Sequence, residues 1–448
     1  MAVDPRARLK QWLDSGEAQL HPLTLPQREL WEVCPVPPED NANHICSLIE
    51  IHGLLTERDA RAAIQQVVDR QEVLRLSILR GKEQPLQLVR KSSGINFDYR
   101  ELASNDTTAE AIEQKIAEIF RAPFDLIQGP LYRIADLRRA PDEHVLVLAI
   151  HHAIADGWSL GVLLQDLFAA YVDVVMGSTA ALPRVPQTYT AWGAAERAYW
   201  GPPVIDLNAE FWKTKLANSP RMWKAPITPG PPHRWLSIIS LNLANEAREL
   251  TRQNSVTLFS VLFGAFQIAF AEWNGVDDLV VGTPVANRNR QSARDTMGYY
   301  AGIVPLRAQL DRSRTVSDHL RSGHQQTVDS FAHAIPFAEL VRVLGERSEP
   351  GYNPVFEVRF ALQNHPMPAI SLPNLSARLG MRSTGTPRFQ LACEITEIDE
   401  GLEVAWLFRD NLFSPRDIES LDAIFQRVLA SICRSPNVRI SELLNRPQ

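Results

Sequence analysis

The residues with the clearest chemical potential stand together as HHAIADGWS, positions 151–159. A histidine side chain titrates near pH 6.5 when nothing perturbs it, so a neutral imidazole is available to accept a proton at cellular pH. His151 or His152 is therefore a candidate acceptor for the proton of an attacking amine or hydroxyl group. Asp156 follows four residues after His152 and is placed to orient an imidazole ring or to hold the loop.

Other chemistries fit this segment less well. Adjacent histidines in an extended segment point to opposite faces, so they cannot easily share a zinc ion. A serine hydrolase needs a G-x-S-x-G turn around its nucleophile, and Ser159 does not stand in one. The phosphate-binding G-x-x-x-x-G-K-[ST] loop is absent from the chain. A plainer alternative stays open, because histidines at a strand end often serve only as structural hydrogen-bonding residues and Asp156 could be only a helix cap.

Buried secondary structure is predicted on both sides of HHAIADGWS. HVLVLAI, residues 144–150, is a short continuous apolar run that predicts a strand buried on both faces. Apolar residues recur at helical spacing from Leu160 to Tyr171 and predict an amphipathic helix. The ends of buried strands are where α/β folds present functional groups, and a helix start adds unpaired N–H groups and a positive dipole end.

The N-terminal part of the chain shows the same strand–helix plan. CSLIEIH, residues 46–52, predicts a strand, and Thr56 with Asp59 makes a capping box for a following helix. Proline is concentrated between about 176 and 233, which predicts a bridge of turns and extended connectors between two lobes.

The second half also indicates α/β structure. LSIISLNL at 236–243 and LVVGT at 279–283 predict strands, and a long apolar helix is predicted to begin near Thr257. At about 150 residues per domain, a chain of 448 residues favours two lobes.

The composition is that of a soluble globular protein, with 45% apolar and 22% charged residues. A net charge of -6 without a long basic run gives no electrostatic footprint for nucleic acid or an anionic membrane. No signal peptide and no apolar run of about 18 residues is found. The cysteines lack metal or redox spacing and are expected to be reduced core thiols of a cytoplasmic protein; they are Cys34, Cys46, Cys393 and Cys433.

HHAIADGWS resembles the HHxxxDG signature of the condensation domains of nonribosomal peptide synthetases. The resemblance runs from about residue 20 to about residue 440, with further segments in the family's order. These segments are LTLPQRELW (23–31), RQEVLR (70–75), PFDLIQGPLYR (123–133), VVGTPVANRNR (280–290), MGYYAGIVPLR (297–307), YNPVFEVRFALQN (352–364) and LFRDNLFSP (407–415).

The resemblance implies an α/β fold of two chloramphenicol acetyltransferase-like lobes that form a V-shaped pseudodimer with a central tunnel. It implies a donor acyl group that arrives as a thioester on the phosphopantetheine arm of a carrier protein, and a nucleophile that enters from the other end of the tunnel. We expect an N-terminal extension (1–20), frayed and solvated rather than a short docking helix, an N-terminal lobe with the motif (21–185), and a linker and C-terminal lobe (186–448).

The same resemblance suggests roles for single residues. It places His152 beside the nucleophile as general base or positioning partner, and it gives His151 a structural part in the motif. It also implies a structural pair between Asp156 and Arg288, although composition alone makes Arg288 an ordinary solvated loop arginine. Gly157 would bring its N–H to the thioester oxygen, unless it is simply a turn glycine.

Aromatic and polar residues near the motif are candidates for the wall of the tunnel. Trp158, Ser159 and Tyr300 are the residues we expect there. Trp31 and Trp192 are further candidates, but buried tryptophans usually fill a core.

Local residues separate this chain from related enzymes. Heterocyclising members replace both histidines with aspartate, and epimerising members follow the motif with S-W-R, whereas Ser159 is followed here by LGVL. The D-F-G-W-G of plant-type acyltransferases that use coenzyme A is absent. Gln71 replaces the family's usual histidine, and Asn411 replaces a frequent aspartate. We expect both departures to be peripheral to the function. Residues 299–302, YYAG, replace the commoner F-F-V-N, which reshapes the tunnel and puts the usual acceptor in doubt.

The leading hypothesis is an acyltransferase that condenses a carrier-bound acyl, peptidyl or polyketide thioester with a small or carrier-bound amine or hydroxyl, without a metal or cofactor of its own. One alternative is an acyltransferase that uses soluble acyl-CoA, and a second is a non-catalytic module that recruits another protein to a synthetase. No adenylation or carrier segment is found between Met1 and Gln448, so we expect either a free-standing enzyme or an excised domain, and the initiator-like start favours the former. We expect a monomer that binds neither nucleic acid nor a membrane.

Overall fold

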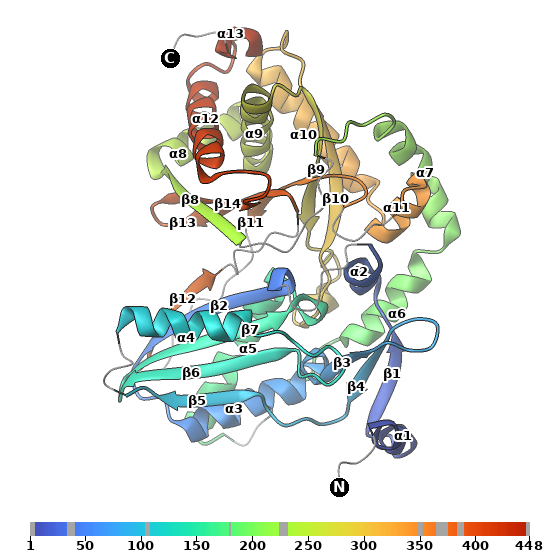
Figure 1. Ribbon diagram of the computed structural model, residues 1–448, viewed down its shortest axis with the longest axis vertical. Helices are drawn as coiled ribbons and strands as arrows, with labels where there is room; N and C mark the ends of the chain where they lie inside the picture. Colours follow the sequence, from blue (N-terminus) through green and yellow to red (C-terminus); the bar gives the residue numbers. More distant parts are fainter. Residues whose placement is uncertain are drawn as a thin grey trace.

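Two mixed sheets, each built mainly from one half of the chain, form the two lobes of the computed structural model (Figure 1). The structure describes residues 5–33, 41–103, 108–178, 181–223, 232–347, 353–363, 375–382 and 389–444. The predicted α/β class is confirmed, and the two buried clusters of apolar side chains follow the two sheets.

The N-terminal lobe is built on a five-stranded sheet with the order β12-β2-β7-β6-β5. Its central strand β7 is buried at every position from His144 to His151, because helices cover both faces of the sheet. The expectation of a strand buried on both faces is therefore confirmed. The strands are β2 (His44–His52), β5 (Phe97–Glu101), β6 (Tyr132–Ala140), β7 (Glu143–His151) and β12 (Ser376–Arg382), and the helices are α3 (Glu57–Arg70), α4 (Ala109–Arg121) and α5 (Gly157–Val175).

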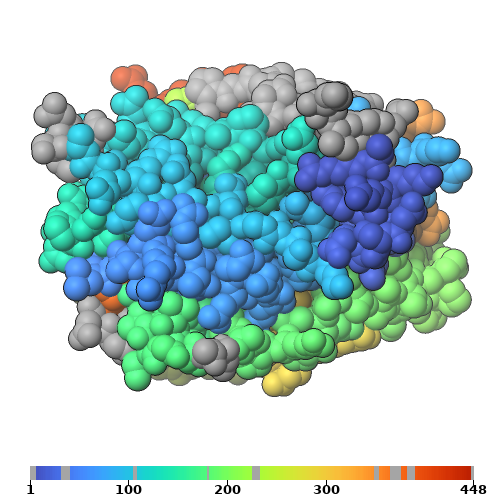
Figure 2. All heavy atoms as spheres, turned by 90° about the horizontal axis from the view of Figure 1, so that it is seen from below, coloured from blue at the N-terminus to red at the C-terminus, as the bar shows by residue number. Residues whose placement is uncertain are grey.

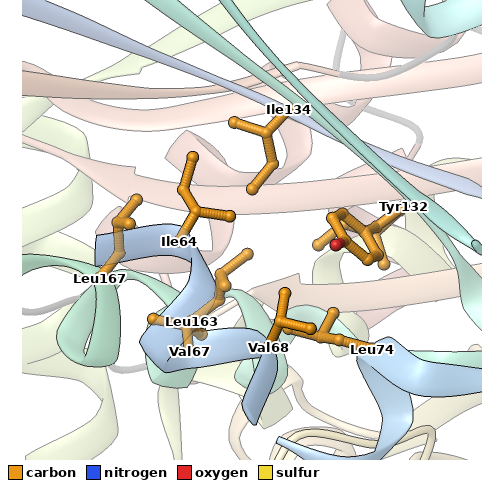
Figure 3. A pocket seen from close by; sticks show the side chains of 9 residues that line it. Ile64, Val67, Val68, Leu74, Tyr132, Ile134, Leu163 and Leu167 are labelled. Atoms are coloured by element: carbon orange, nitrogen blue, oxygen red, sulfur yellow. The ribbon is translucent and has the colours of Figure 1, made fainter. Parts of the chain in front are cut away.

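Helices α3 and α5 pack together on one face of this sheet. Figure 3 shows apolar side chains of both helices pointing toward Tyr132 and Ile134 of β6. The space left between them is about 10 Å³, too small for a substrate, so this face is packed core. Thr56 caps α3 by accepting the N–H of Asp59, as its spacing predicted.

α5 is also the one straight helix of the described residues that is long and apolar enough to cross a membrane. About 56% of its most apolar window is buried inside the protein, so the packed core accounts for its apolar character. α8 and α9 pass the same test only as a pair bent by 106°.

Residues 5–22 do not form the frayed extension that the sequence favoured. Pro5–Asp14 is the helix α1, which lies on the surface of the N-terminal lobe (Figure 2), and Arg90 stacks over the ring of Trp12. The next residues form β1 (Ala18–Pro22), the edge of a small sheet with β4 (Leu86–Arg90) and β3 (Leu76–Leu79).

The C-terminal lobe is a six-stranded sheet with the order β10-β9-β11-β13-β14-β8. Its main helices lie on the side of the sheet away from the N-terminal lobe (Figure 1). The strands are β8 (Pro232–Ser240), β9 (Asp278–Val285), β10 (Gly302–Gln309), β11 (Val358–Gln363), β13 (Leu391–Ile398) and β14 (Gly401–Arg409). The helices are α8 (Leu241–Asn254), α9 (Leu258–Asn274), α10 (Val316–Ala332), α11 (Phe337–Leu344), α12 (Pro415–Arg434) and α13 (Ile440–Leu444).

Two predicted elements differ from the structure. The strand expected at 236–243 ends at Ser240, because the Ser240 hydroxyl accepts the N–H of Leu243 and starts helix α8. The proline-rich bridge contains two helices, α6 (Tyr189–Tyr199) and α7 (Pro202–Lys215), rather than turns alone. Proline is tolerated in α7 because it stands in the first turn, where an N–H has no helical partner.

The two halves of the chain are interleaved. β12 lies between β11 and β13 in sequence, yet it pairs with β2 at the edge of the N-terminal sheet. Tyr189, Met297 and Tyr300 also belong to the first apolar cluster, whereas the second is built from residues from Ile205 onward. The segment near residues 293–301 therefore connects the second half to the N-terminal lobe, next to the end of β7.

Candidate active site

The HHAIADGWS segment lies where β7 ends and α5 begins. His151 is the last residue of β7, residues 152–154 form one turn of 3₁₀ helix, and Gly157 is the first residue of α5. The strand–turn–helix arrangement predicted around the motif is thus present. The amide of Gly157 belongs to the first helical turn, whose N–H groups lack carbonyl partners within the helix and lie at its positive end.

The two histidines have different surroundings. The Nδ1 of His151 accepts the backbone N–H of Ala153 at 3.0 Å, so this buried ring caps the turn. The Nδ1 of His152 lies 3.1 Å from the carbonyl oxygen of Ala155. A carbonyl only accepts, so Nδ1 of His152 carries the hydrogen and the neutral ring has its lone pair at Nε2. His152 is half-buried, and the edge of its ring meets Tyr299 with centroids 5.5 Å apart.

Asp156 is the N-cap of α5 and is 3% exposed. Its Oδ1 accepts the N–H and the hydroxyl of Ser159 at 2.8 and 2.7 Å and Nη2 of Arg288 at 2.9 Å. Its Oδ2 accepts the N–H groups of Tyr300 and Ala301 at 3.1 and 3.2 Å. Five donors hold this carboxylate, so Asp156 fixes structure rather than transferring protons.

Arg288 is buried, at 4% exposure, and is not the solvated loop residue that composition alone favoured. Besides Asp156, it donates through Nη1 to the carbonyl oxygen of Thr296 at 2.7 Å. Its guanidinium also lies over the ring of Tyr300, 4.0 Å from the centroid. The Asp156–Arg288 pair thus joins the start of α5 to the 288–301 segment of the second half.

Two of the three expected tunnel residues lie elsewhere. Ser159 and Tyr300 are 0% exposed, and the Ser159 hydroxyl lies 2.7 Å from the carbonyl oxygen of Gly298 and accepts the Gly298 N–H at 3.0 Å. Both residues belong to the buried contacts around Arg288 rather than to a substrate surface. Trp158 is half-buried and its indole N–H donates to the carbonyl oxygen of Arg294 at 3.0 Å.

The two remaining tryptophan candidates pack in the apolar cluster of the N-terminal lobe, and Gln71, which replaces the family's usual histidine, also lies in this lobe. Trp192 is buried and packs against Tyr300, and Trp31 packs at the edge of the same cluster. Gln71 is buried rather than peripheral: its amide donates to Asp166 at 2.7 Å and its oxygen accepts the N–H of Met297 at 2.9 Å. It therefore helps to hold the 288–301 segment against the N-terminal lobe.

Gln27 supports the active-site turn, although the sequence interpretation gave it no role. Its amide donates to the carbonyl oxygen of Ala153 at 2.8 Å, and its oxygen accepts the N–H of Thr24 at 3.0 Å. Thr24 in return caps α2 (Leu25–Arg28), so the two residues form a capping box. The spacing of Thr24 and Gln27 is the sequence signal that would have identified this box.

We expect Gln27→Leu to destabilise the protein by about 1–3 kcal/mol, because the buried carbonyl of Ala153 and N–H of Thr24 lose their partners. Urea unfolding of the variant measures this. Gln325→Leu serves as the control, because Gln325 is exposed and its amide donates to Asp329 at the surface. Equal unfolding midpoints for the two variants would contradict a specific contribution of the buried Gln27 amide to the stability of the protein.

An open cleft of about 490 Å³ lies close to this site, between the two lobes. Its walls come from α2 and α6 on one side and from β9, β10 and the start of α11 on the other. Figure 1 shows α2 between the lobes, beside these elements.

Metal and cysteine chemistry have no site among the residues that the structure describes. No group of three or more His, Cys, Asp or Glu side chains there is arranged to hold a metal ion. Cys46 and Cys393 are buried unpaired thiols, and burial raises the pKa of Cys46 to about 12. Cys433 is half-buried and also unpaired, whereas Cys34 lies outside the described residues.

A protein-family model described as "Condensation domain" matches residues 17–447. Chondramide synthase cmdD of Chondromyces crocatus is 26% identical over 435 residues, which are 95% of this chain and 11% of that protein. Gramicidin S synthase 2 of Brevibacillus brevis is 23% identical over 435 residues, 95% of this chain and 10% of that protein. The chain thus spans about a tenth of the length of these relatives.

A solved structure shows the same fold. It is the condensation domain from the Monacolin K polyketide synthase MokA, with a TM-score of 0.81 and 18% sequence identity. The match covers 94% of this chain and 99% of that domain.

Proposed function

The chain belongs to the condensation-domain family, and from that premise we propose that it transfers an acyl group from the phosphopantetheine thioester of a carrier protein to an amine or hydroxyl group. Condensation domains form amide bonds in natural-product biosynthesis, which is an acyltransferase reaction. The acyl group is a simple acyl, peptidyl or polyketide chain, and the product is an amide or an ester.

One observation carries the proposal: the contact that fixes the tautomer of His152. The hydrogen bond from Nδ1 to the Ala155 carbonyl leaves Nε2 as the proton-accepting nitrogen of the neutral ring. Nε2 takes the proton of the nucleophile, or positions it, while the nucleophile's lone pair attacks the thioester carbonyl carbon. The carbon–sulfur bond then breaks, and the departing thiolate takes the proton from the imidazolium.

Gly157 supports the charge that develops on the carbonyl oxygen. A first-turn amide at the positive end of α5 is suited to donate a hydrogen bond to an oxyanion. His151 and Asp156 do not take part in proton transfer in this proposal, because their hydrogen bonds hold the turn and the start of α5.

We propose further that the two lobes form a V with a tunnel between them, in which the carrier's arm and the nucleophile meet at His152. The chain itself binds no cofactor, since phosphopantetheine arrives on the carrier protein. We also propose that it acts as a monomer in the cytoplasm, apart from membranes and nucleic acid. The unpaired thiols of Cys46 and Cys393 fit a reducing compartment.

The experiment is intact-protein mass spectrometry of an acyl-loaded carrier protein mixed with this protein and a set of amines and alcohols. We expect the carrier to lose the mass of the acyl group and an amide or ester product to appear. The nucleophile found in the product, an amine or an alcohol, shows which of the two bonds has formed. Turnover of acyl-CoA without any carrier would instead establish a soluble-donor acyltransferase. No product from either donor, with a stable complex with another biosynthetic protein, would make the chain a recruitment module.

A further inference from the structure

The cleft between the lobes borders segments that hold the active-site turn in place. Leu25 and Pro26 line it and are neighbours of Gln27, which holds the carbonyl of Ala153 beside His152. On the opposite wall, Asn287 and Gly302 line the cleft. They adjoin Arg288 and Ala301, which both donate to Asp156. The walls of the cleft are therefore continuous in sequence with the segments that hold the catalytic turn.

Glu196 of α6 is the unusual group of this cleft. It lines the cleft, and its carboxyl accepts the backbone N–H of Leu25. Its other oxygen, Oε2, is buried and has no hydrogen-bond partner among the described residues. Burial raises the pKa of Glu196 to about 8. One oxygen of this carboxyl has a hydrogen-bond partner and the other has none, and burial disfavours its ionised form. Such a carboxyl is suited to receive a ligand that supplies a partner for the second oxygen.

The other groups around Glu196 decide what this ligand is. Trp192, Tyr199 and Trp200 contribute aromatic rings to the same wall, and such rings attract organic cations. The lining residues from α10, α11 and β10 are apolar, or glycine. The charged residues of the lining are Glu29, Glu196 and Arg290, and Arg290 is solvent-exposed. Arg197 lies next to Glu196 in α6 and also favours its charged form.

We propose that Glu196 selects nucleophiles that carry a second, positively charged ammonium group apart from the attacking amine or hydroxyl. The ammonium group pairs with the Glu196 carboxylate in the cleft, and the attacking group reaches toward His152. This rests on the proposed condensation function and narrows its nucleophile to diamines and amino alcohols. Glu196 is a specificity-determining residue here, because it binds the part of the substrate that does not react.

The sign of the pH dependence follows from the chemistry of the pair. Below about pH 8 the Glu196 carboxyl of the empty cleft is mainly protonated, so binding an ammonium group requires loss of that proton. Preference for the cationic nucleophile therefore rises as the pH increases from 6.5 to 8.5. The adjacent ammonium in turn lowers the pKa of the carboxyl.

The test compares pentane-1,5-diamine with pentan-1-amine as nucleophiles for the same acyl-loaded carrier. The two amines share the length and the attacking group, and either end of the diamine can attack. A ratio of kcat/KM above the statistical factor of about two therefore reports the second ammonium group. We expect the wild type to favour the diamine by about tenfold, the range of a partly desolvated cation held by aromatic rings and a carboxylate. Glu196→Gln, which keeps an acceptor for the Leu25 N–H, is expected to bring the ratio to the statistical value of about two and to remove its pH dependence.

Two controls separate the possible failures. Arg290→Gln removes the opposite charge from the same cleft, so it should keep or raise the preference for the diamine. Calorimetric titration of the diamine alone into wild type and Glu196→Gln reports binding without catalysis, and we expect heat with the wild type only. A wild-type ratio of kcat/KM of about two or less overturns the role of Glu196 while condensation stands. No product from any amine or alcohol, with no binding of the diamine, overturns both proposals.

Discussion

Replacing His152 with alanine is expected to lower the rate of condensation by about 10²- to 10⁴-fold, the usual cost of losing a proton-transfer group. The ring is half-buried and donates a hydrogen bond to the Ala155 carbonyl, and its loss removes the proton acceptor. Product formation from an acyl-loaded carrier, followed by mass spectrometry, measures the rate.

His152→Asn is the matched control for this prediction. Its side-chain amide can still donate to the Ala155 carbonyl, but it offers no basic nitrogen at the place of Nε2. If proton transfer is the role of His152, the asparagine variant is as slow as the alanine variant. A rate near that of the wild type in either variant would remove His152 from the chemistry.

Arg288→Met is expected to destabilise the protein by about 3–5 kcal/mol, because it leaves the Asp156 carboxylate buried without its cation. The substitution keeps most of the apolar length of the side chain, so lost charge and hydrogen bonds dominate the effect. Arg288 also donates to the carbonyl of Thr296, which adds a second unsatisfied group. The midpoint of chemical unfolding measures the change.

Arg294→Met is the control, because Arg294 is an exposed arginine of the same segment and loses only a solvated charge. The double variant Asp156→Asn/Arg288→Met should be more stable than the sum of the two single changes predicts, since no unpaired charge is left in the interior. Additive effects, or equal midpoints for Arg288→Met and Arg294→Met, would contradict a specific contribution of the pair.

The local parts of this fold follow from short stretches of sequence. The apolar run 144–150 and the helical spacing after Leu160 gave the strand and helix around the motif, and Thr56 and Thr257 marked helix starts that the structure contains. Such signals work because backbone hydrogen bonding and side-chain periodicity act within a few residues. The strand at 236–243 was predicted three residues too long, because the apolar leucines after Ser240 suit a helix as well as a strand.

The positions that depend on distant partners were decided by the tertiary structure. Asp156 and Arg288 are 132 residues apart, and only the family resemblance, not their spacing or composition, suggested that they meet. β12 joins the N-terminal sheet from the second half of the chain, and no local pattern specifies that partner. The same contacts place Ser159 and Tyr300 in the interior, where the sequence had suggested a substrate surface.

The sequence by itself determined the chemical groups and their immediate geometry: two adjacent histidines, an aspartate and a glycine between a buried strand and a helix. Which histidine has its proton-accepting nitrogen at Nε2, and which carboxylates are costly to ionise, was decided only when distant segments packed around them. Glu196 stands in a helix of mixed polar and apolar residues, and only the folded chain buries its carboxyl and brings it to the N–H of Leu25, 171 positions earlier. Desolvation and hydrogen bonding are properties of the surroundings, so they come into being with the tertiary contacts.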